Sequence, residues 1–181
     1  MTRSLYSKFI LGYLIFGLLG FITIATFSSK MTRDYLVRYQ ADAMYDEANI
    51  IASSCSTMYQ GKRMDSQIRA LSKYLKAEIW VVNRQGTIVM DSQGGLRVQT
   101  DISNFDPAAM GNRSYTTGRF YGLFNENVLS VSAPITGNYN TYGYVLIHLP
   151  LSQITQSQND ILNILYITSA IVFALSLIIL L

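Results

Sequence analysis

The stretch "AEIWVVNRQGTIVMDS", residues 77–92, predicts a β-hairpin. Apolar residues surround Trp80, a polar loop at residues 83–86 ends in glycine, and a second apolar run follows at residues 88–90. β-Branched and aromatic residues on both sides of a short loop containing glycine are typical of two antiparallel strands joined by a tight turn. We therefore expect strands at residues 78–83 and 87–91, and a sheet built around them.

Two long apolar segments flank the region that contains this hairpin. Residues 9–29 and 161–181 carry no charged side chain, and each segment is 21 residues long. A helix of about 20 residues crosses the roughly 30 Å hydrocarbon layer of a membrane. We expect both segments to be membrane spans. A cleaved signal peptide is the alternative for the first segment, but its apolar run exceeds the roughly 7–15 residues of such peptides.

Positive charge near the chain ends predicts the orientation. Arg3 and Lys8 lie on the N-terminal flank, residues 1–8, which should stay in the cytoplasm. The segment between the spans, residues 30–160, should then be exported. It carries 12 Lys and Arg against 11 Asp and Glu, so its net charge of +1 gives no argument for binding nucleic acid. No Lys or Arg cluster follows residues 161–181, and we expect the natural protein to continue beyond them.

A long helix should lead from the first span into the exported region, because residues 21–60 contain neither proline nor glycine. Apolar residues recur along it at alternating spacings of four and three: Val37, Ala41, Met44, Ala48, Ile51, Cys55 and Met58. Such a seam packs either on the domain's own sheet or on a second copy of the helix. We expect sheet packing far from the membrane and a homodimer contact close to it. A second amphipathic helix should follow Gly61, with Met64, Ile68, Leu71 and Leu75 on one face.

Three further strands are expected after the hairpin, at residues 114–121, 128–135 and 142–149. Pro107 suits the first turn of a short helix ending near Met110, and Gly137 with Asn138 marks the last turn. Strands 78–83, 128–135 and 142–149 are richest in Val, Ile and Leu, so they should be the central ones. The fold class is therefore α+β.

The two spans, the long entry helix, "WVVNRQGTIVMDS" and the later "YGYVLIHLPLSQI" together resemble the extracytoplasmic single Cache (PAS-like) sensor domains of bacterial transmembrane receptors. The resemblance covers most of residues 31–154. It implies a five-stranded antiparallel sheet with the long helix on one face and a ligand pocket on the other. It also implies a homodimer in the plasma membrane and a cytoplasmic output, most often a histidine kinase. Asp91 and the loop around Arg97 would belong to such a pocket.

Strand alternation assigns side chains to the two faces of the sheet. One face should be aliphatic and meet the long helix. The other should gather polar and aromatic residues: Arg119, Tyr115, Tyr121, Ser130, Ser132, Tyr144 and His148, with Trp80 as a wall. An arginine among hydroxyl groups suits a small anionic or amino-acid-like ligand. The alternative is a solvated face with no ligand, which antiparallel sheets often have.

The residue types argue against a catalytic or metal site in this chain. Cys55 and His148 are the single cysteine and the single histidine, and Cys55 falls on the apolar seam. A buried cysteine is favoured over an intermolecular disulfide, and a hydrogen-bonded histidine over a pH sensor. We expect no cofactor. The favoured hypothesis is the input part of a sensor histidine kinase. The alternatives are a chemoreceptor, a cyclic-dinucleotide enzyme, or a protein-interaction module without a small ligand.

Overall fold

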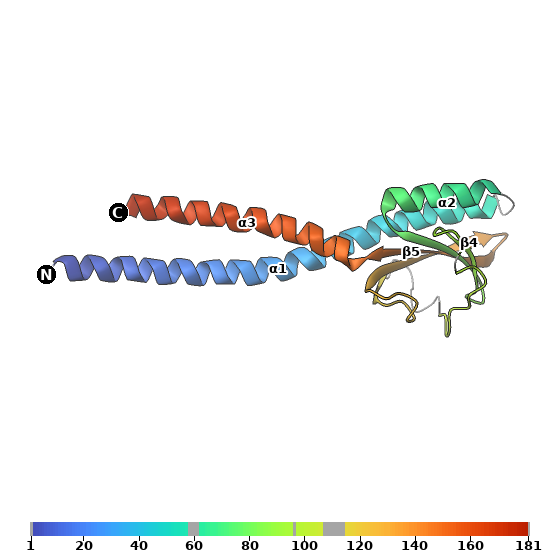
Figure 1. Cartoon of the computed structure of the whole chain (residues 1–181), viewed down its shortest axis with the longest axis horizontal. Coiled ribbons are helices and arrows are strands. Elements are labelled where there is room, and N and C mark those ends of the chain that lie inside the picture. The colour runs from blue at the N-terminus through green and yellow to red at the C-terminus, as the bar shows by residue number, and fades with distance from the viewer. Residues whose placement is uncertain (1, 58–61, 96, 107–114, 181) are drawn as a thin grey trace. The chain divides into compact units, whose positions relative to one another are not determined.

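The computed structural model of the chain describes residues 2–57, 62–95, 97–106 and 115–180 (Figure 1). It divides into two compact units. The sheet unit comprises Val37–Gln153, and the helix-pair unit comprises Met1–Leu36 together with Ile154–Leu181. The short helix predicted at residues 107–110 falls outside the described residues.

The predicted hairpin is confirmed as β1 (Glu78–Asn83) and β2 (Ile88–Asp91), which pair antiparallel. Its turn closes on the Asn83 side chain, whose oxygen accepts hydrogen bonds from the backbone N–H groups of Gln85 (3.0 Å) and Thr87 (2.9 Å). Asparagine makes this local bond readily, which is why it initiates turns. The same turn places Gly86 at φ +90°, a conformation that glycine adopts without strain.

The sheet has five antiparallel strands in the order β2-β1-β5-β4-β3. The remaining strands are β3 (Tyr115–Gly118), β4 (Val128–Gly137) and β5 (Asn140–Pro150). β1, β5 and β4 are therefore the inner strands, as their aliphatic content predicted. β4 and β5 run further than expected because their two-residue turn lies at Asn138 and Tyr139, both with positive φ, as in the primed turns of tight hairpins.

β3 is shorter than predicted, and the reason is local backbone geometry. Phe120 and Tyr121 adopt left-handed φ angles of 33° and 52°, which no strand accommodates. The strand therefore ends at Gly118, and residues 119–127 form a loop. Phe120 is buried in this loop although its neighbours Arg119 and Tyr121 are exposed. The loop is thus folded inward at Phe120, a feature that strand alternation does not predict.

The apolar seam of the long helix is buried, as predicted. α1 (Thr2–Thr57) is continuous, and Val37, Ala41, Met44, Ala48, Ile51 and Cys55 are each at most 9% exposed; Met58 lies outside the described residues. Figure 1 shows α2 (Lys62–Leu75) and the C-terminal part of α1 on one side of the sheet. Burial raises the pKa of the Cys55 thiol to about 11, which keeps it protonated and unreactive at neutral pH.

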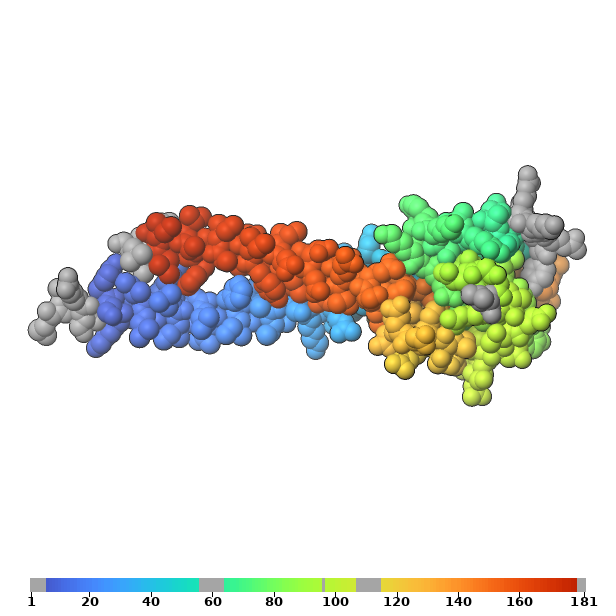
Figure 2. Space-filling view, in the orientation of Figure 1, coloured from blue at the N-terminus to red at the C-terminus, as the bar shows by residue number. Residues whose placement is uncertain are grey.

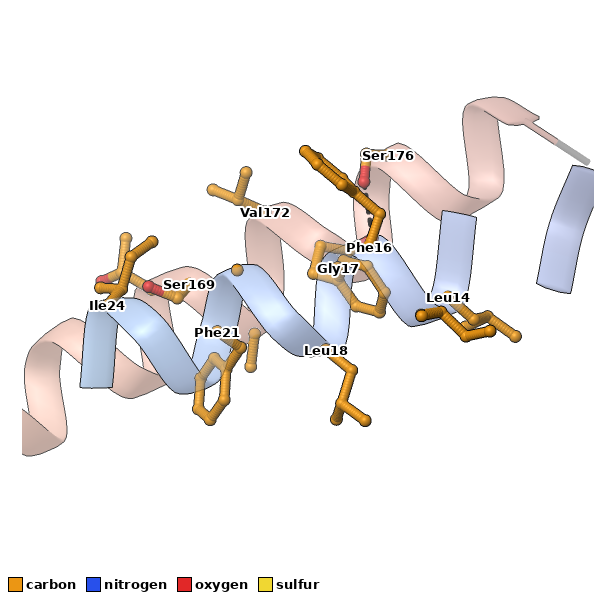
Figure 3. A pocket seen from close by; sticks show the side chains of 14 residues that line it. Leu14, Phe16, Gly17, Leu18, Phe21, Ile24, Ser169, Val172 and Ser176 are labelled. Atoms are coloured by element: carbon orange, nitrogen blue, oxygen red, sulfur yellow. Dashed lines mark hydrogen bonds between the residues drawn. The ribbon is translucent and has the colours of Figure 1, made fainter. Parts of the chain in front are cut away.

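The helix-pair unit consists of the N-terminal part of α1 and most of α3 (Leu151–Leu180). Both helices are long and apolar enough to cross a membrane. They pack through aromatic rings, with Tyr13 stacked on Phe173 at a centroid distance of 5.7 Å. Gly17 allows this approach, because a Cβ there would collide with the Phe173 ring. The groove beside them, shown in Figure 3, is lined almost wholly by apolar atoms.

Close packing between β1 and β5 generates a prediction about Gly143. A Cβ at this position would lie 2.2 Å from the backbone oxygen of Val82, which cannot move without disrupting the ladder. Gly143→Ala should therefore lower the free energy of unfolding by about 3 kcal/mol. Denaturant unfolding of the chain in detergent, followed by the fluorescence of its single tryptophan, Trp80, measures this change.

Gly137→Ala is the matched control. The nearest atom to its Cβ, at 2.9 Å, belongs to the exposed side chain of Tyr142, which can rotate away. We expect a loss of at most about 0.5 kcal/mol. Equal losses in the two variants would show that β1 and β5 do not need glycine at their contact.

Candidate functional site

Four rings gather on the sheet face that is turned away from the helices. Trp80 lies on β1 and His148 on β5, while Phe120 and Phe124 come from the β3–β4 loop. The Trp80 ring lies 4.3 Å from that of His148 and 5.2 Å from that of Phe124, and Phe120 lies 4.4 Å from His148. Trp80 and His148 have no exposed surface. This aromatic cluster fills the centre of the face where the sequence predicted a pocket.

Arg97 closes one side of the aromatic cluster. Its guanidinium carbon lies 5.1 Å from the centroid of Trp80 and 4.8 Å from that of Phe124, within the range of cation–π attraction. The same group donates a hydrogen bond of 2.5 Å to the backbone oxygen of Leu123 and lies 3.5 Å from the Glu78 carboxylate. Arg97 therefore ties the β2–β3 loop to the β3–β4 loop, and Figure 2 shows these two segments side by side.

Asp91 and Ser92, at the end of the hairpin, hold the loop that carries Arg97. The buried carboxylate of Asp91 accepts hydrogen bonds from the backbone N–H groups of Gln93 (2.8 Å) and Arg97 (3.2 Å). Ser92 bonds to Ile79 through both its backbone and its side chain. Asp and Ser side chains bond readily to nearby backbone groups, so Asp91 and Ser92 end β2 and order the turn that follows it.

His148 is the most completely buried ionisable group of the sheet face. Its Nδ1 lies 2.8 Å from Ser130 Oγ, whereas its Nε2 has no hydrogen-bond partner among the described residues. Burial, helped by the positive charge of Arg97, lowers the pKa of His148 to about 3. The imidazole is therefore neutral at physiological pH, and it is a hydrogen-bonding group rather than a cation.

Glu78 supplies the negative charge of the site. Its carboxylate accepts a hydrogen bond of 2.8 Å from the indole N–H of Trp80 and pairs with Arg97. Burial raises the pKa of the Glu78 carboxyl above its ordinary value, while the bond from Trp80 and the charge of Arg97 act in the opposite direction. Glu78 and His148 are cross-strand neighbours, so two hydrogen-bonding groups lie next to each other at the edge of the cluster.

A cavity of about 310 Å³ adjoins this edge. It is lined by the end of α2, the start of β1, the β3–β4 loop and the end of β5, and both Glu78 and His148 contribute to its wall. Among the described residues, no group of three or more His, Cys, Asp or Glu side chains could hold a metal ion. The arrangement can bind a small polar molecule through hydrogen bonds and charge.

Strand pairing brings most of the predicted site residues onto one face. Ser130 is opposite His148 and Ser132 opposite Leu146, while Leu146 is in turn opposite Trp80. Tyr144 pairs with Val82 and Pro134 on the same face and packs against the buried apolar residues of that face. Trp80, Ser130, Ser132, Tyr144 and His148 therefore share a face, as alternation predicted.

The placement of Tyr115 with these residues is wrong. Tyr115 pairs with Val131, so it lies on the opposite face from Ser130. Arg119 and Tyr121 lie beyond the end of β3 in the loop, where both are exposed, and the Tyr121 hydroxyl accepts a hydrogen bond of 3.3 Å from the Asp106 N–H. The prediction failed for Arg119 and Tyr121 because strand alternation does not continue past Gly118, where Phe120 and Tyr121 take left-handed φ angles. It failed for Tyr115 because the register of β3 against β4 decides its face.

Sequence reasoning also missed three residues that form the site. Glu78 could have been found, because it precedes Trp80 by two positions on the same strand and must share its face. Phe120 and Phe124 carry no periodic pattern, since they lie on a loop. Their inward position depends on the backbone path of residues 119–127, which only the folded chain shows.

Comparisons with known proteins agree with this architecture. No protein-family model matches the sequence, and no curated protein matches it either. The structure is similar to the sensor domain of E. coli DcuS, with 21% identity and a TM-score of 0.50, over 71% of this chain and 98% of that one. It is also similar to the sensor domain of the V. cholerae histidine kinase DctB, with 12% identity and a TM-score of 0.52, over 81% and 60% of the two chains.

A third similar structure is the ligand-binding domain of the Campylobacter jejuni chemoreceptor Tlp3 in complex with L-valine, with 10% identity and a TM-score of 0.51. The match covers 76% of this chain and 66% of that one, so this chain spans less than two thirds of the DctB and Tlp3 structures. At these identities the likeness shows the fold. The chain has the α+β, Cache-type fold of extracytoplasmic sensor domains, as its sequence predicted.

The buried neutral state of His148 predicts how stability depends on pH. Its pKa falls from an ordinary 6.5 to about 3 on folding, so between these values the unfolded chain binds a proton that the folded chain does not. The stabilisation is complete above about pH 6.5 and is lost as the pH falls toward about 3. Between about pH 7 and pH 4.5, His148 should account for a loss of about 2–3 kcal/mol.

Denaturant unfolding of wild type and His148→Gln at several pH values isolates this contribution. Glutamine keeps a polar side chain but does not titrate, so the variant should lose less stability on acidification. The contribution of the carboxylates is common to both proteins and cancels in the comparison. Parallel curves for the two proteins would contradict the burial of a neutral histidine.

Proposed function

We propose that this chain is the input part of a bacterial transmembrane receptor, with the sheet unit outside the plasma membrane and the N-terminus in the cytoplasm. The parent protein is a sensor histidine kinase, and the chain contributes signal reception rather than catalysis. Residues 9–29 and 161–181 are its two membrane spans. In this arrangement the sheet unit meets the external signal, and both spans carry the response inward.

Continuity of secondary structure is the observation that carries this proposal. α1 runs from Thr2 to Thr57 without interruption, so the first apolar segment and the buried seam belong to one helix. β5 ends at Pro150 and α3 begins at Leu151, so one helix runs from the sheet into the second apolar segment. A change of arrangement in the sheet unit can therefore act on both helices, and displacements of about 1–2 Å are sufficient in known switches.

The similar structures support a receptor role. One is the sensor domain of the histidine kinase DctB, and another is the ligand-binding domain of the chemoreceptor Tlp3 in complex with L-valine. By analogy, a signal that binds one arrangement of the sheet unit better than another shifts the population between them, whereas equal affinity shifts nothing.

A homodimer is part of this proposal. Just after the first apolar segment, α1 exposes large apolar and aromatic side chains: Met31 (61%), Tyr35 (66%) and Tyr39 (61%). They follow the first span and lie beside the start of the buried seam at Val37, where a second copy of α1 would cover them. The sequence favoured a dimer contact along the membrane-proximal part of the seam itself; Met31, Tyr35 and Tyr39 lie beside that seam.

One observation favours a second candidate function, a protein-interaction module. The aromatic cluster fills the centre of the sheet face, and Tyr121 and Tyr142 are exposed at 42% and 44%. A filled face with exposed tyrosines suits a protein partner. The open cavity beside Glu78 and His148 favours a small ligand instead, and we therefore rank the ligand-binding receptor first.

Membrane topology tests the receptor proposal directly. Tyr139, at the tip of the β4–β5 hairpin, is fully exposed. In a Cys55→Ser background, Tyr139→Cys should react with a membrane-impermeant maleimide on intact cells. Thr2→Cys, on the N-terminal flank, should react only after lysis, because that flank is cytoplasmic.

The Cys55→Ser protein without added cysteine is the control for background labelling. The reverse pattern, with residue 2 labelled on intact cells and residue 139 only after lysis, would contradict an exported sheet unit. Loss of the N-terminal segment from the mature protein would contradict the first membrane span.

A further inference from the structure

The β3–β4 loop, residues 119–127, fills the centre of the sheet face with its own side chains. It folds back on itself through backbone hydrogen bonds from the N–H of Leu123 to the oxygen of Phe120 (3.0 Å) and from the N–H of Phe124 to the oxygen of Arg119 (3.2 Å). This turn buries Phe120, which is 7% exposed, and packs Phe124 against the same buried residues. The face is therefore closed by a loop rather than by the strands themselves.

The backbone of this loop is strained where it turns inward. Phe120 and Tyr121 have left-handed φ angles of 33° and 52°, a region that bulky residues with a β-carbon rarely adopt. Glycine adopts it without strain, as Gly122 does at φ 76°. Such strain persists only where the surrounding structure holds it, and here the packing of Phe120 into the buried core holds it. The strain is released when Phe120 leaves this position.

The same packing leaves a buried hydrogen-bonding atom without a partner. His148 Nε2 has none among the described residues. The rings of Trp80, Phe120 and Phe124 cover the imidazole, with centroids 4.3, 4.4 and 4.9 Å from its own. The indole N–H of Trp80, the one hydrogen-bond donor on these rings, is already bonded to Glu78. Since a buried polar atom without a partner has lost its bonds to water, withdrawal of the loop would restore them.

The loop also adjoins open space. Phe124 and Glu126 line the cavity of about 310 Å³ at the edge of the aromatic cluster. Protein interiors are ordinarily packed without voids of this size, so the loop is supported on one side less than a core element is. Backbone strain, the unpaired nitrogen and the cavity all raise the free energy of the closed loop, and the burial of Phe120 lowers it. The closed loop is therefore less stable than its burial alone implies.

The far end of the loop is joined to α3. The backbone oxygen of Asn127 accepts a hydrogen bond of 2.9 Å from the Leu151 N–H, and the Glu126 carboxylate accepts one of 3.2 Å from Ser152 Oγ. Leu151 and Ser152 are the first two residues of α3. A loop that withdraws at Phe120 therefore changes the support of this helix at its first turn.

We propose that the β3–β4 loop is a plug with two positions. In the closed position Phe120 covers His148 and the sheet face is filled. In the open position Phe120 withdraws, the backbone of the loop relaxes, and His148 Nε2 becomes accessible to solvent. The inference rests on the proposed receptor function for its role and adds to it the element that moves. A signal acts on the plug by favouring one position over the other.

Two residues that occur once in the chain report separately on the plug and on the whole fold. His148 is the only histidine, and Cys55, the only cysteine, is buried in the apolar seam of α1 at 1% exposure. Diethyl pyrocarbonate acylates an accessible imidazole, and N-ethylmaleimide alkylates an accessible thiol. Both reactions are followed by peptide mass spectrometry on the 181-residue chain in lipid nanodiscs, at urea concentrations below the unfolding transition. Each rate is divided by the rate in the chain unfolded at high urea.

On this scale His148 should be labelled at least about tenfold faster than Cys55, because the plug opens without unfolding the sheet unit. His148 labelling should depend little on urea, since withdrawal of one loop exposes little surface, whereas Cys55 labelling should rise steeply. Equal rates with equal urea dependence would overturn the proposal, because His148 would then be reached only when the whole fold opens.

Two substitutions at Tyr121 test whether the loop is the element that moves. Tyr121→Gly and Tyr121→Ala both remove the exposed side chain, but only glycine also removes the strain of the left-handed φ angle. The closed loop is more stable in Tyr121→Gly, so His148 should be labelled about threefold more slowly than in Tyr121→Ala. Equal His148 labelling in the two variants would show that the opening releases no strain in the loop, and the assignment of the plug to this loop would be wrong.

The plug and the receptor role can fail separately. Reaction of His148 and Cys55 depends on how the sheet unit opens and not on which side of the membrane it lies. The maleimide labelling of residues 2 and 139 on intact cells decides the topology, whatever the plug experiment shows.

Discussion

The complete burial of Trp80 is the constraint on which the rest of this fold depends. An indole N–H without a partner is costly in the interior, so the strand supplies Glu78 two residues earlier to accept it. A half-buried carboxylate needs a positive charge in turn, and Arg97 supplies it while stacking over the Trp80 ring. Arg97 can do so because Asp91 holds its loop. Each polar group in this series is required by the one before it.

The contacts that begin at Trp80 continue to α3, the helix that leaves the sheet unit. Arg97 binds the backbone of Leu123 in the β3–β4 loop, and four residues later the oxygen of Asn127 accepts a hydrogen bond of 2.9 Å from the Leu151 N–H. Glu126 of the same loop bonds Ser152. The loop is therefore held at one end by the aromatic cluster and holds the first turn of α3 at the other. This connection gives the sheet unit a physical route to its C-terminal helix.

The elements that depend on periodic burial could be predicted from the sequence. The boundaries of β1 were predicted to the residue, and the seam from Val37 to Cys55 followed from its spacing of four and three. These patterns succeed because a strand or helix repeats one local geometry, so one buried residue implies the next. Trp80, Ser130 and His148 were placed on a common face for the same reason.

The site was predicted less well because loops complete it. Phe120 lies in the cluster because the backbone of its loop turns with positive φ. Arg97 is held there by a hydrogen bond to Leu123, which is 26 positions away in the sequence. Tyr115 was misplaced because its face depends on the register of β3 against β4, which puts it opposite Val131 and which the sequence pattern does not show. The single unpaired atom of His148 follows from packing in three dimensions and has no counterpart in the residue pattern.

Amide hydrogen exchange at Leu151 measures the connection from the aromatic cluster to α3 most directly. Arg97→Ala should release the β3–β4 loop and accelerate exchange at Leu151 by about tenfold or more, relative to the wild type in the same nanodiscs. Arg84→Ala, at an exposed arginine in the turn of the first hairpin, should leave it unchanged. Equal exchange in the Arg97 variant and the wild type would contradict the account, since α3 would then be held independently of the cluster built on Trp80.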